Sequence, residues 1–118
     1  MVRMKNLIKN IDFATALTLK DLVSYQKGQV VSKTLAQNKS LSLTLFAFDK
    51  DEEISSHESS GDAMVIALDG AGLITIGDKS YTVHAGETIV MPRNTPHAVF
   101  AAEQFKMFLI VVFPQPEK

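Results

Sequence analysis

The most informative stretch of the chain is GETIVMPRNTPH, residues 86–97. Its β-branched and apolar residues from Thr88 to Met91 predict a short buried strand. Pro92 should end that strand, because proline lacks the amide hydrogen that a strand donates. His97 follows Pro96 and opens a second apolar run, HAVFAA. A histidine at the start of a strand can point into the fold, so His97 is the first candidate for chemistry.

The composition is that of one globular domain. A chain of 118 residues fits a single domain, expected here to span residues 1–118. Apolar residues make up 46% and charged residues 21%, and no apolar segment is long enough to cross a bilayer. The N-terminus has no apolar core of signal-peptide length. We expect a cytoplasmic protein with no membrane partner.

Charge and cysteine content exclude several functions. The chain has no cysteine, which removes disulfides, thiolate metal sites and cysteine nucleophiles. The formal net charge is −1 and no basic cluster is present, so the chain lacks the electrostatic pattern of a nucleic-acid-binding protein. A small molecule is the expected partner, and any metal would need nitrogen and oxygen ligands.

Residues 1–28 form a short irregular N-terminal segment, in which we expect a short helix or turn near residues 12–18. Short strands separated by turn residues follow this segment. The pattern predicts about nine strands and a turn at residues 69–72. This series of short strands predicts an all-β sandwich or barrel. The expected strands are 29–35, 41–48, 54–57, 63–68, 73–76, 81–83, 88–91, 97–102 and 105–113.

Two of these strands are apolar on both faces. Residues 46–48 and 105–113 carry more apolar side chains than a single core requires. We therefore expect a homodimer that buries part of their outer faces, and the strand at residues 29–35 could be exchanged between the subunits.

The second half of the chain resembles the cupin superfamily, whose second motif is written G-x5-P-x-G-x2-H-x3-N. Gly86, Pro92 and His97 fall on that motif. Asn94 stands in place of its second glycine, and Ala101 in place of its asparagine.

The first cupin motif, G-x5-H-x-H-x3,4-E-x6-G, is matched by His57 and Gly70. Asp51 replaces the opening glycine, Ser59 the second histidine and Ala63 the glutamate. The resemblance implies a small single-domain cupin of the conserved-barrel type 2, of a kind found in bacteria. Its fold would be a double-stranded β-helix, or jelly-roll barrel, with its core at residues 41–113.

The resemblance also defines the candidate site. Typical cupins bind a divalent metal through three histidines and a glutamate, and only His57 and His97 of that set remain here. Asp62 could act as a third ligand if it turned inward, but strand alternation points it outward when Ala63 points in. The metal-binding motif is therefore degenerate.

Three interpretations follow from the two histidines. In the leading interpretation, the protein binds a small molecule in the barrel cavity through His57 and His97, with no cofactor and no tightly held metal. Under this interpretation the protein is not an enzyme. The alternative is a metal-dependent isomerase, decarboxylase or dioxygenase, with Fe, Mn, Ni or Zn held by His57, His97 and Asp62. In the third, the histidines are partly buried polar residues and the cavity is vestigial. We expect His84 and Arg93 to be solvated.

Overall fold

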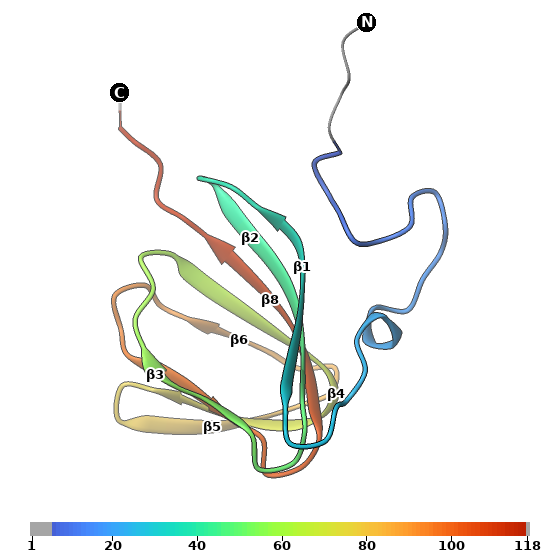
Figure 1. The fold of residues 1–118 in the computed structure, drawn as a ribbon. Coiled ribbons are helices and arrows are strands. Elements are labelled where there is room, and N and C mark those ends of the chain that lie inside the picture. Colours follow the sequence, from blue (N-terminus) through green and yellow to red (C-terminus); the bar gives the residue numbers. More distant parts are fainter. Residues whose placement is uncertain (1–5, 118) are drawn as a thin grey trace, which may run out of the picture.

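A computed structural model describes residues 6–117, which form eight β-strands and one short 3-10 helix (Figure 1). The elements are η1 (Leu19–Leu22), β1 (Val30–Gln37), β2 (Leu41–Phe48), β3 (Glu53–His57), β4 (Asp62–Ile76), β5 (Lys79–His84), β6 (Thr88–Met91), β7 (His97–Phe100) and β8 (Phe105–Val112).

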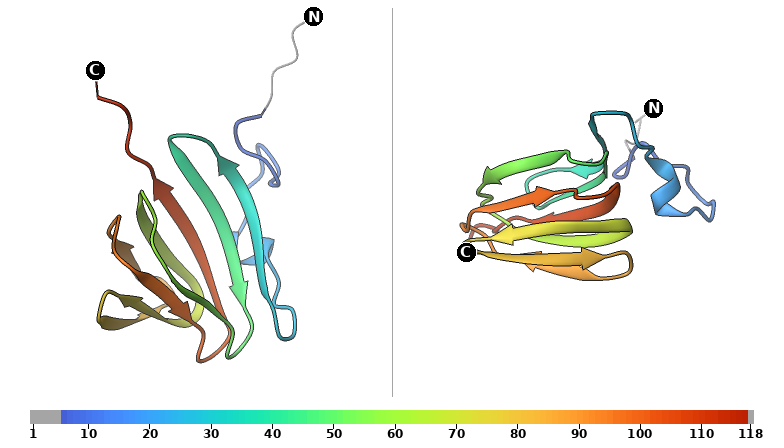
Figure 2. Two further views of the ribbon diagram at one scale, coloured as in Figure 1. Left: turned by 60° about the vertical axis from the view of Figure 1, so that its left-hand side comes forward. Right: turned by 90° about the horizontal axis from the view of Figure 1, so that it is seen from below.

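The strands form one curled antiparallel sheet. Its order is β1-β2-β8-β4-β7-β3, and β5 and β6 each pair with β4 away from this path. The sheet folds back on itself, so that two layers face each other (Figure 2). The all-β barrel predicted from the strand pattern is confirmed. The strand predicted at residues 88–91 is β6, and it ends immediately before Pro92.

The turn predicted at residues 69–72 is wrong, because β4 runs through it without a break. The strand bends instead: its pairing with β8 has a bulge between Ala67 and Asp69, and Gly70 has a φ of +71°. A bulge increases the local twist while the strand continues. The first half of β4 pairs with β6 and β8, and the second half with β5 and β7. Residues 6–117 therefore form eight strands and not nine.

The helix expected near residues 12–18 lies further along the chain. The helical turn of the N-terminal segment is η1, at Leu19–Leu22. Ala14, inside the expected helix, has a φ of +53°, a left-handed conformation that interrupts a right-handed helix. Within residues 6–117, no helix has the length and apolar character needed to cross a membrane.

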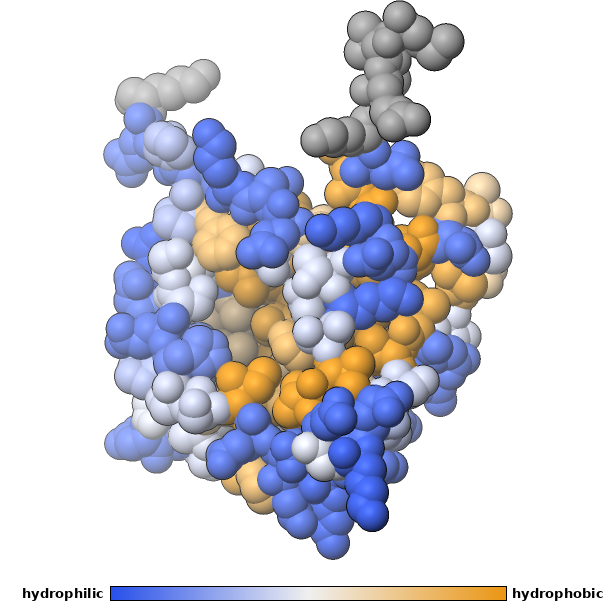
Figure 3. Space-filling view, in the orientation of Figure 1, coloured by the Kyte–Doolittle hydropathy of each residue, from blue (hydrophilic) through white to orange (hydrophobic). Residues whose placement is uncertain are grey.

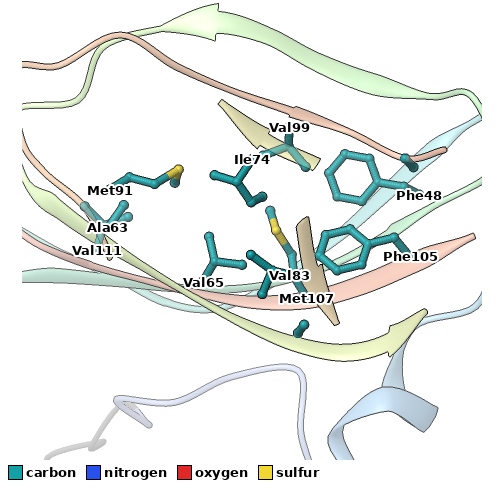
Figure 4. Close-up of a cluster of buried hydrophobic side chains, with 12 residues drawn as sticks. Phe48, Ala63, Val65, Ile74, Val83, Met91, Val99, Phe105, Met107 and Val111 are labelled. Atoms are coloured by element: carbon teal, nitrogen blue, oxygen red, sulfur yellow. The ribbon is translucent and has the colours of Figure 1, made fainter. Parts of the chain in front are cut away.

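The inward side chains of the two layers form the main core. Figure 4 shows Phe48 and Phe105 at one end of this cluster and Ala63, Met91 and Val111 at the other. The two phenylalanine rings lie 5.8 Å apart, and both are fully buried. The cluster consists of Phe48, Ala63, Val65, Ala67, Ile74, Val83, Met91, Val99, Ala101, Phe105, Met107 and Val111.

A second apolar cluster lies on the outer face of the layer formed by β1, β2, β8 and β4. Here Leu35, Leu45 and Ala47 are buried beneath Val23 and its neighbours in the N-terminal segment. Tyr25 fixes the segment, because its hydroxyl donates a hydrogen bond to the Asp69 carboxylate. Part of the face that we expected a homodimer to bury is thus covered by the chain itself. The strand considered for exchange, β1, pairs with β2 of its own chain.

Candidate functional site

Strands β3 and β7 bring His57 and His97 together. The two residues are direct partners in the antiparallel pairing of these strands. Their rings lie 4.4 Å apart at an angle of 66°, an edge-to-face arrangement. The pair sits where β3 ends and β7 begins, and we call this end of the barrel the histidine end. The resemblance placed both histidines at one site, and the structure has them in contact.

The backbone sets the tautomer of both imidazoles. Nδ1 of His57 lies 3.0 Å from the Ser55 carbonyl oxygen, and Nδ1 of His97 lies 3.1 Å from that of Thr95. A carbonyl oxygen only accepts hydrogen bonds, so Nδ1 carries the hydrogen in each neutral ring. Nε2 of each ring then presents a lone pair, the form in which imidazole accepts a hydrogen bond, takes up a proton or binds a metal.

The two histidines differ in their exposure. His57 is exposed, whereas only 4% of the His97 surface is accessible. Burial lowers the pKa of His97 below its ordinary value; the hydrogen bond to Thr95 opposes this, and the nearby His57 adds to it. No buried side-chain nitrogen or oxygen of the described chain lacks a hydrogen-bond partner. Nε2 of His97 makes no hydrogen bond to these residues, so it is at least partly accessible.

The remaining positions of the first motif supply no metal ligand. Ala63 points into the core, where it pairs across the strands with Met91. The Ser59 hydroxyl oxygen accepts a hydrogen bond from the Gly61 amide. The Asp62 carboxylate accepts one from the Arg93 amide at 2.8 Å, so it caps a turn.

This donor set does not fit the four-ligand centre of typical cupins. Within residues 6–117, no group of three His, Cys, Asp or Glu side chains is placed to hold a metal ion. Asp62 is therefore not brought together with His57 and His97. Two imidazoles without a carboxylate form an incomplete ligand set for iron, manganese, nickel or zinc.

Two residues that replace motif glycines keep a glycine-like backbone. Asp51 has a φ of +71° and Asn94 a φ of +58°. Aspartate and asparagine tolerate this left-handed conformation better than other side chains, so the turns survive the replacement. The Asn94 amide also donates a hydrogen bond to the Ser59 carbonyl oxygen. The turn that carries His97 is thereby attached to the loop that follows His57, a contact that motif spacing alone did not predict.

Several surface grooves are lined by other residues. One of about 600 Å³ lies between the β1–β2 turn and the C-terminal residues, and includes Lys39 and Gln115. Another, of about 450 Å³, includes Leu73, Phe100 and His84. His84 is exposed and pairs with Glu87, as expected for a solvated residue.

Solved structures with the same fold are numerous. A conserved protein of unknown function from Streptococcus pyogenes is 44% identical, with 97% of this chain and 100% of that chain covered and a TM-score of 0.93. A cupin superfamily protein from Desulfitobacterium hafniense is 29% identical, with coverage of 91% and 98% and a TM-score of 0.87. A cupin 2 conserved barrel domain protein from Leptotrichia buccalis is 42% identical, with coverage of 81% and 47% and a TM-score of 0.80.

The family comparison agrees with the fold and with the motif positions. No curated protein matches the chain. The family described as cupin domain matches residues 44–113, which include β4, β6, β7 and both histidines. The chain therefore belongs to the cupin domain family.

Proposed function

We propose that the protein binds a small molecule at the histidine end of the barrel, through Nε2 of His57 and of His97, without holding a metal tightly. The observation that carries this proposal is the shared orientation of the two rings. Both Nδ1 atoms face backbone carbonyls, so both Nε2 atoms are left for a ligand.

The chemistry of the pair indicates what kind of ligand it would accept. When both rings are neutral, each Nε2 can accept a hydrogen bond from a hydroxyl or an amine. When one ring is protonated, the pair attracts a carboxylate or another small anion. Protonation of both rings is opposed because they lie only 4.4 Å apart.

Apolar neighbours favour a ligand with an apolar body. Ile76 pairs with His97 across β4 and β7, and Ile54 on β3 packs against the main core. The ligand class that fits is a small molecule with an apolar body and one polar or anionic group, such as an aromatic acid.

Thermal-shift screening with small carboxylates, sugars and aromatic acids tests this proposal, because a ligand that binds the folded state raises the unfolding temperature. Stabilisation should disappear in the His57→Gln/His97→Gln variant and persist in His84→Gln, which alters the third histidine of the chain. Equal stabilisation of all three proteins would place the ligand elsewhere, and no stabilisation by any compound would support a vestigial cavity.

The metal-dependent enzyme remains the second candidate, since two free Nε2 atoms are also metal donors. Elemental analysis of protein purified without chelators separates the two functions. Stoichiometric metal that is lost in His57→Ala/His97→Ala would favour the enzyme. Sub-stoichiometric metal in both proteins would favour the binding protein.

We also propose that the chain works as a homodimer. The proposal is supported by Met64 and Val90, which are 38% and 47% exposed and are direct partners across β4 and β6. Ala63 and Met91, the next residues on these strands, point into the core, so Met64 and Val90 point outward.

A further inference from the structure

The inner faces of β1 and β2 carry hydroxyl side chains. Phe46 on β2 packs against the main core, so Ser42 and Thr44, which alternate with it along the strand, also point inward. Thr34 on β1 is the direct partner of Thr44 and therefore lies on the same face of the sheet. We call Thr34, Ser42 and Thr44 the hydroxyl edge.

The inward residues of β1 and β2 are more accessible than some outward residues of the same strands. Outward Leu35 and Leu45 are buried in the cluster that the N-terminal segment covers, whereas inward Thr34 and Ser42 are only half-buried. A barrel filled by its own side chains would show the opposite pattern. Thr44 is 9% exposed, and within residues 6–117 its hydroxyl makes no hydrogen bond, so this oxygen is at least partly accessible. Water therefore reaches the barrel interior beside β1 and β2.

The hydroxyl edge and the histidine pair lie on the two sides of the opening of the barrel. β1 and β3 are the two end strands of the curled sheet, and no strand within residues 6–117 joins them. Thr34 lies on β1, and His57 on β3. His97 points inward, because Val99, two residues further along β7, belongs to the main core. Since His57 is the direct partner of His97, both imidazoles lie on the inner face.

Strand register places the hydroxyl edge toward the histidine end. Ser42 pairs with Val111, one residue before the end of β8. The last residue of β8, Val112, pairs with Asp62, which begins β4. Residues 58–61 connect this point to His57, the last residue of β3. The start of β2, the end of β8 and the end of β3 therefore lie at the same end of the barrel.

A hollow with an apolar floor lies between the two edges. Figure 3 shows the hollow in the face of the molecule that Figure 1 presents, with apolar residues at its floor. In this view β1 and β2 lie to its right and β3 to its lower left (Figure 1). Strand pairing continues the row from Thr34 and Thr44 to Leu109 and Val65 across the inner face of the layer. A ligand that reaches from the histidines to the hydroxyl edge therefore lies over apolar side chains.

We propose that the ligand is an aromatic acid with a hydroxyl group at the end remote from its carboxylate, an inference that rests on the ligand site proposed above. The carboxylate accepts a hydrogen bond from Nε2 of a protonated imidazole, and the ring covers the apolar floor. The phenolic hydroxyl bonds to Thr34 and Thr44, whose hydroxyls can each donate and accept. An acid without this group leaves both threonine hydroxyls without a partner, and a sugar acid places hydroxyls on the apolar floor.

Isothermal titration calorimetry with benzoate, 4-hydroxybenzoate and gluconate tests this ligand class, at about pH 6, where histidine is partly protonated. Wild type should bind 4-hydroxybenzoate about tenfold more tightly than benzoate, and gluconate more weakly than either. Thr34→Val/Thr44→Val keeps the shape of both side chains and removes both hydroxyls. This variant should bind the two aromatic acids equally and benzoate as wild type does.

Two control variants separate the role of the hydroxyls from a change in the fold. Thr34→Ser/Thr44→Ser keeps both hydroxyls and should retain the preference for 4-hydroxybenzoate. Thr82→Val removes a hydroxyl from an exposed residue of β5 and should also retain it. His57→Gln/His97→Gln should lose both aromatic acids.

The inference and the ligand site fail in different ways. Equal binding of benzoate and 4-hydroxybenzoate to wild type, or a preference that survives in Thr34→Val/Thr44→Val, would overturn the role of the hydroxyl edge. If both acids are still lost in His57→Gln/His97→Gln, the ligand site itself stands. Tighter binding of gluconate than of 4-hydroxybenzoate would overturn the aromatic class. Absence of binding of all three acids to wild type would overturn the inference together with the ligand site.

Discussion

The two ends of the barrel interior contain different pairs of rings. At one end Phe48 and Phe105 lie 5.8 Å apart and are fully buried, and we call this the closed end. At the histidine end His57 and His97 lie 4.4 Å apart; His57 is exposed, and 4% of the His97 surface is accessible. Burial of apolar surface at the closed end stabilises the folded state. At the histidine end polar imidazoles occupy positions where apolar side chains would stabilise the fold more. The difference is what we expect if the closed end provides stability and the histidine end is the ligand site that we propose.

Truncation at the closed end should have the largest effect. Phe105→Ala removes a ring that packs on Phe48 and over Gly72, and should lower the free energy of unfolding by about 3 to 5 kcal/mol. Urea unfolding measures this loss, with Phe105→Leu as a milder variant should the alanine variant not fold. A loss below about 1 kcal/mol in Phe105→Ala would show that the closed end does not carry the stability assigned to it.

The bend in β4 should be the next most sensitive feature. A Cβ on Gly70 would lie 1.9 Å from the Gln104 carbonyl oxygen, and the φ of +71° is already unfavourable for alanine. Gly28 has nearly the same φ, +68°, but nothing lies within 4 Å of its Cβ position. Gly28→Ala should therefore cost about 1 to 2 kcal/mol and Gly70→Ala at least about 1 kcal/mol more. If urea unfolding gives equal losses of stability for Gly28→Ala and Gly70→Ala, the close approach of the Gln104 carbonyl oxygen to Gly70 is unimportant.

The hydrogen bond that holds the N-terminal segment should contribute less. Tyr25→Phe removes the hydroxyl that donates to Asp69, and should lower the free energy of unfolding by about 1 kcal/mol. Hydrogen exchange should be faster at the Gln29 amide, which donates to the Gln26 carbonyl oxygen next to Tyr25, and little changed in β7. Uniform acceleration over the whole chain would contradict a local role for this contact.

The smallest effect expected is a pH dependence at the histidine end. Because burial lowers the pKa of His97 in the folded protein, the unfolded chain takes up a proton first as the pH falls below the ordinary histidine value. Stability should therefore be full above that value and should decrease between about pH 7 and about pH 5. His97→Gln should show a smaller decrease than wild type in urea unfolding at the two pH values. Identical pH profiles for wild type and His97→Gln would show that His97 does not cause the pH dependence of stability.

Local features of the sequence predicted much of the fold. Thr88 to Met91 forms the expected strand, and the resemblance to cupins placed His57 and His97 at a single site. Gly86 has the positive φ, +91°, expected of a turn glycine. Each of these features depends on a few neighbouring residues, which is why sequence patterns reveal them.

Other features depend on contacts between distant residues and leave little local signal. The glycines at 70 and 72 are typical of a turn, and only pairing with β8 and β7 shows that β4 continues through them. The cover over Leu45 comes from Val23 and its neighbours, which carry no helical or strand periodicity. Met91 fills the space beside Ala63 in the core, and no motif predicts that pairing.

The protonation state of the imidazole nitrogens decides whether Nε2 of both His57 and His97 is free to bind a ligand. Long-range ¹H–¹⁵N NMR distinguishes the two ring nitrogens, and His84 serves as an internal control. We predict that at alkaline pH His57 and His97 are both neutral with hydrogen on Nδ1. We also predict that benzoate shifts the Nε2 resonances of both rings and leaves those of His84 unchanged. Hydrogen on Nε2 of either ring, or a benzoate response at His84 alone, would show that His57 and His97 do not form the proposed site.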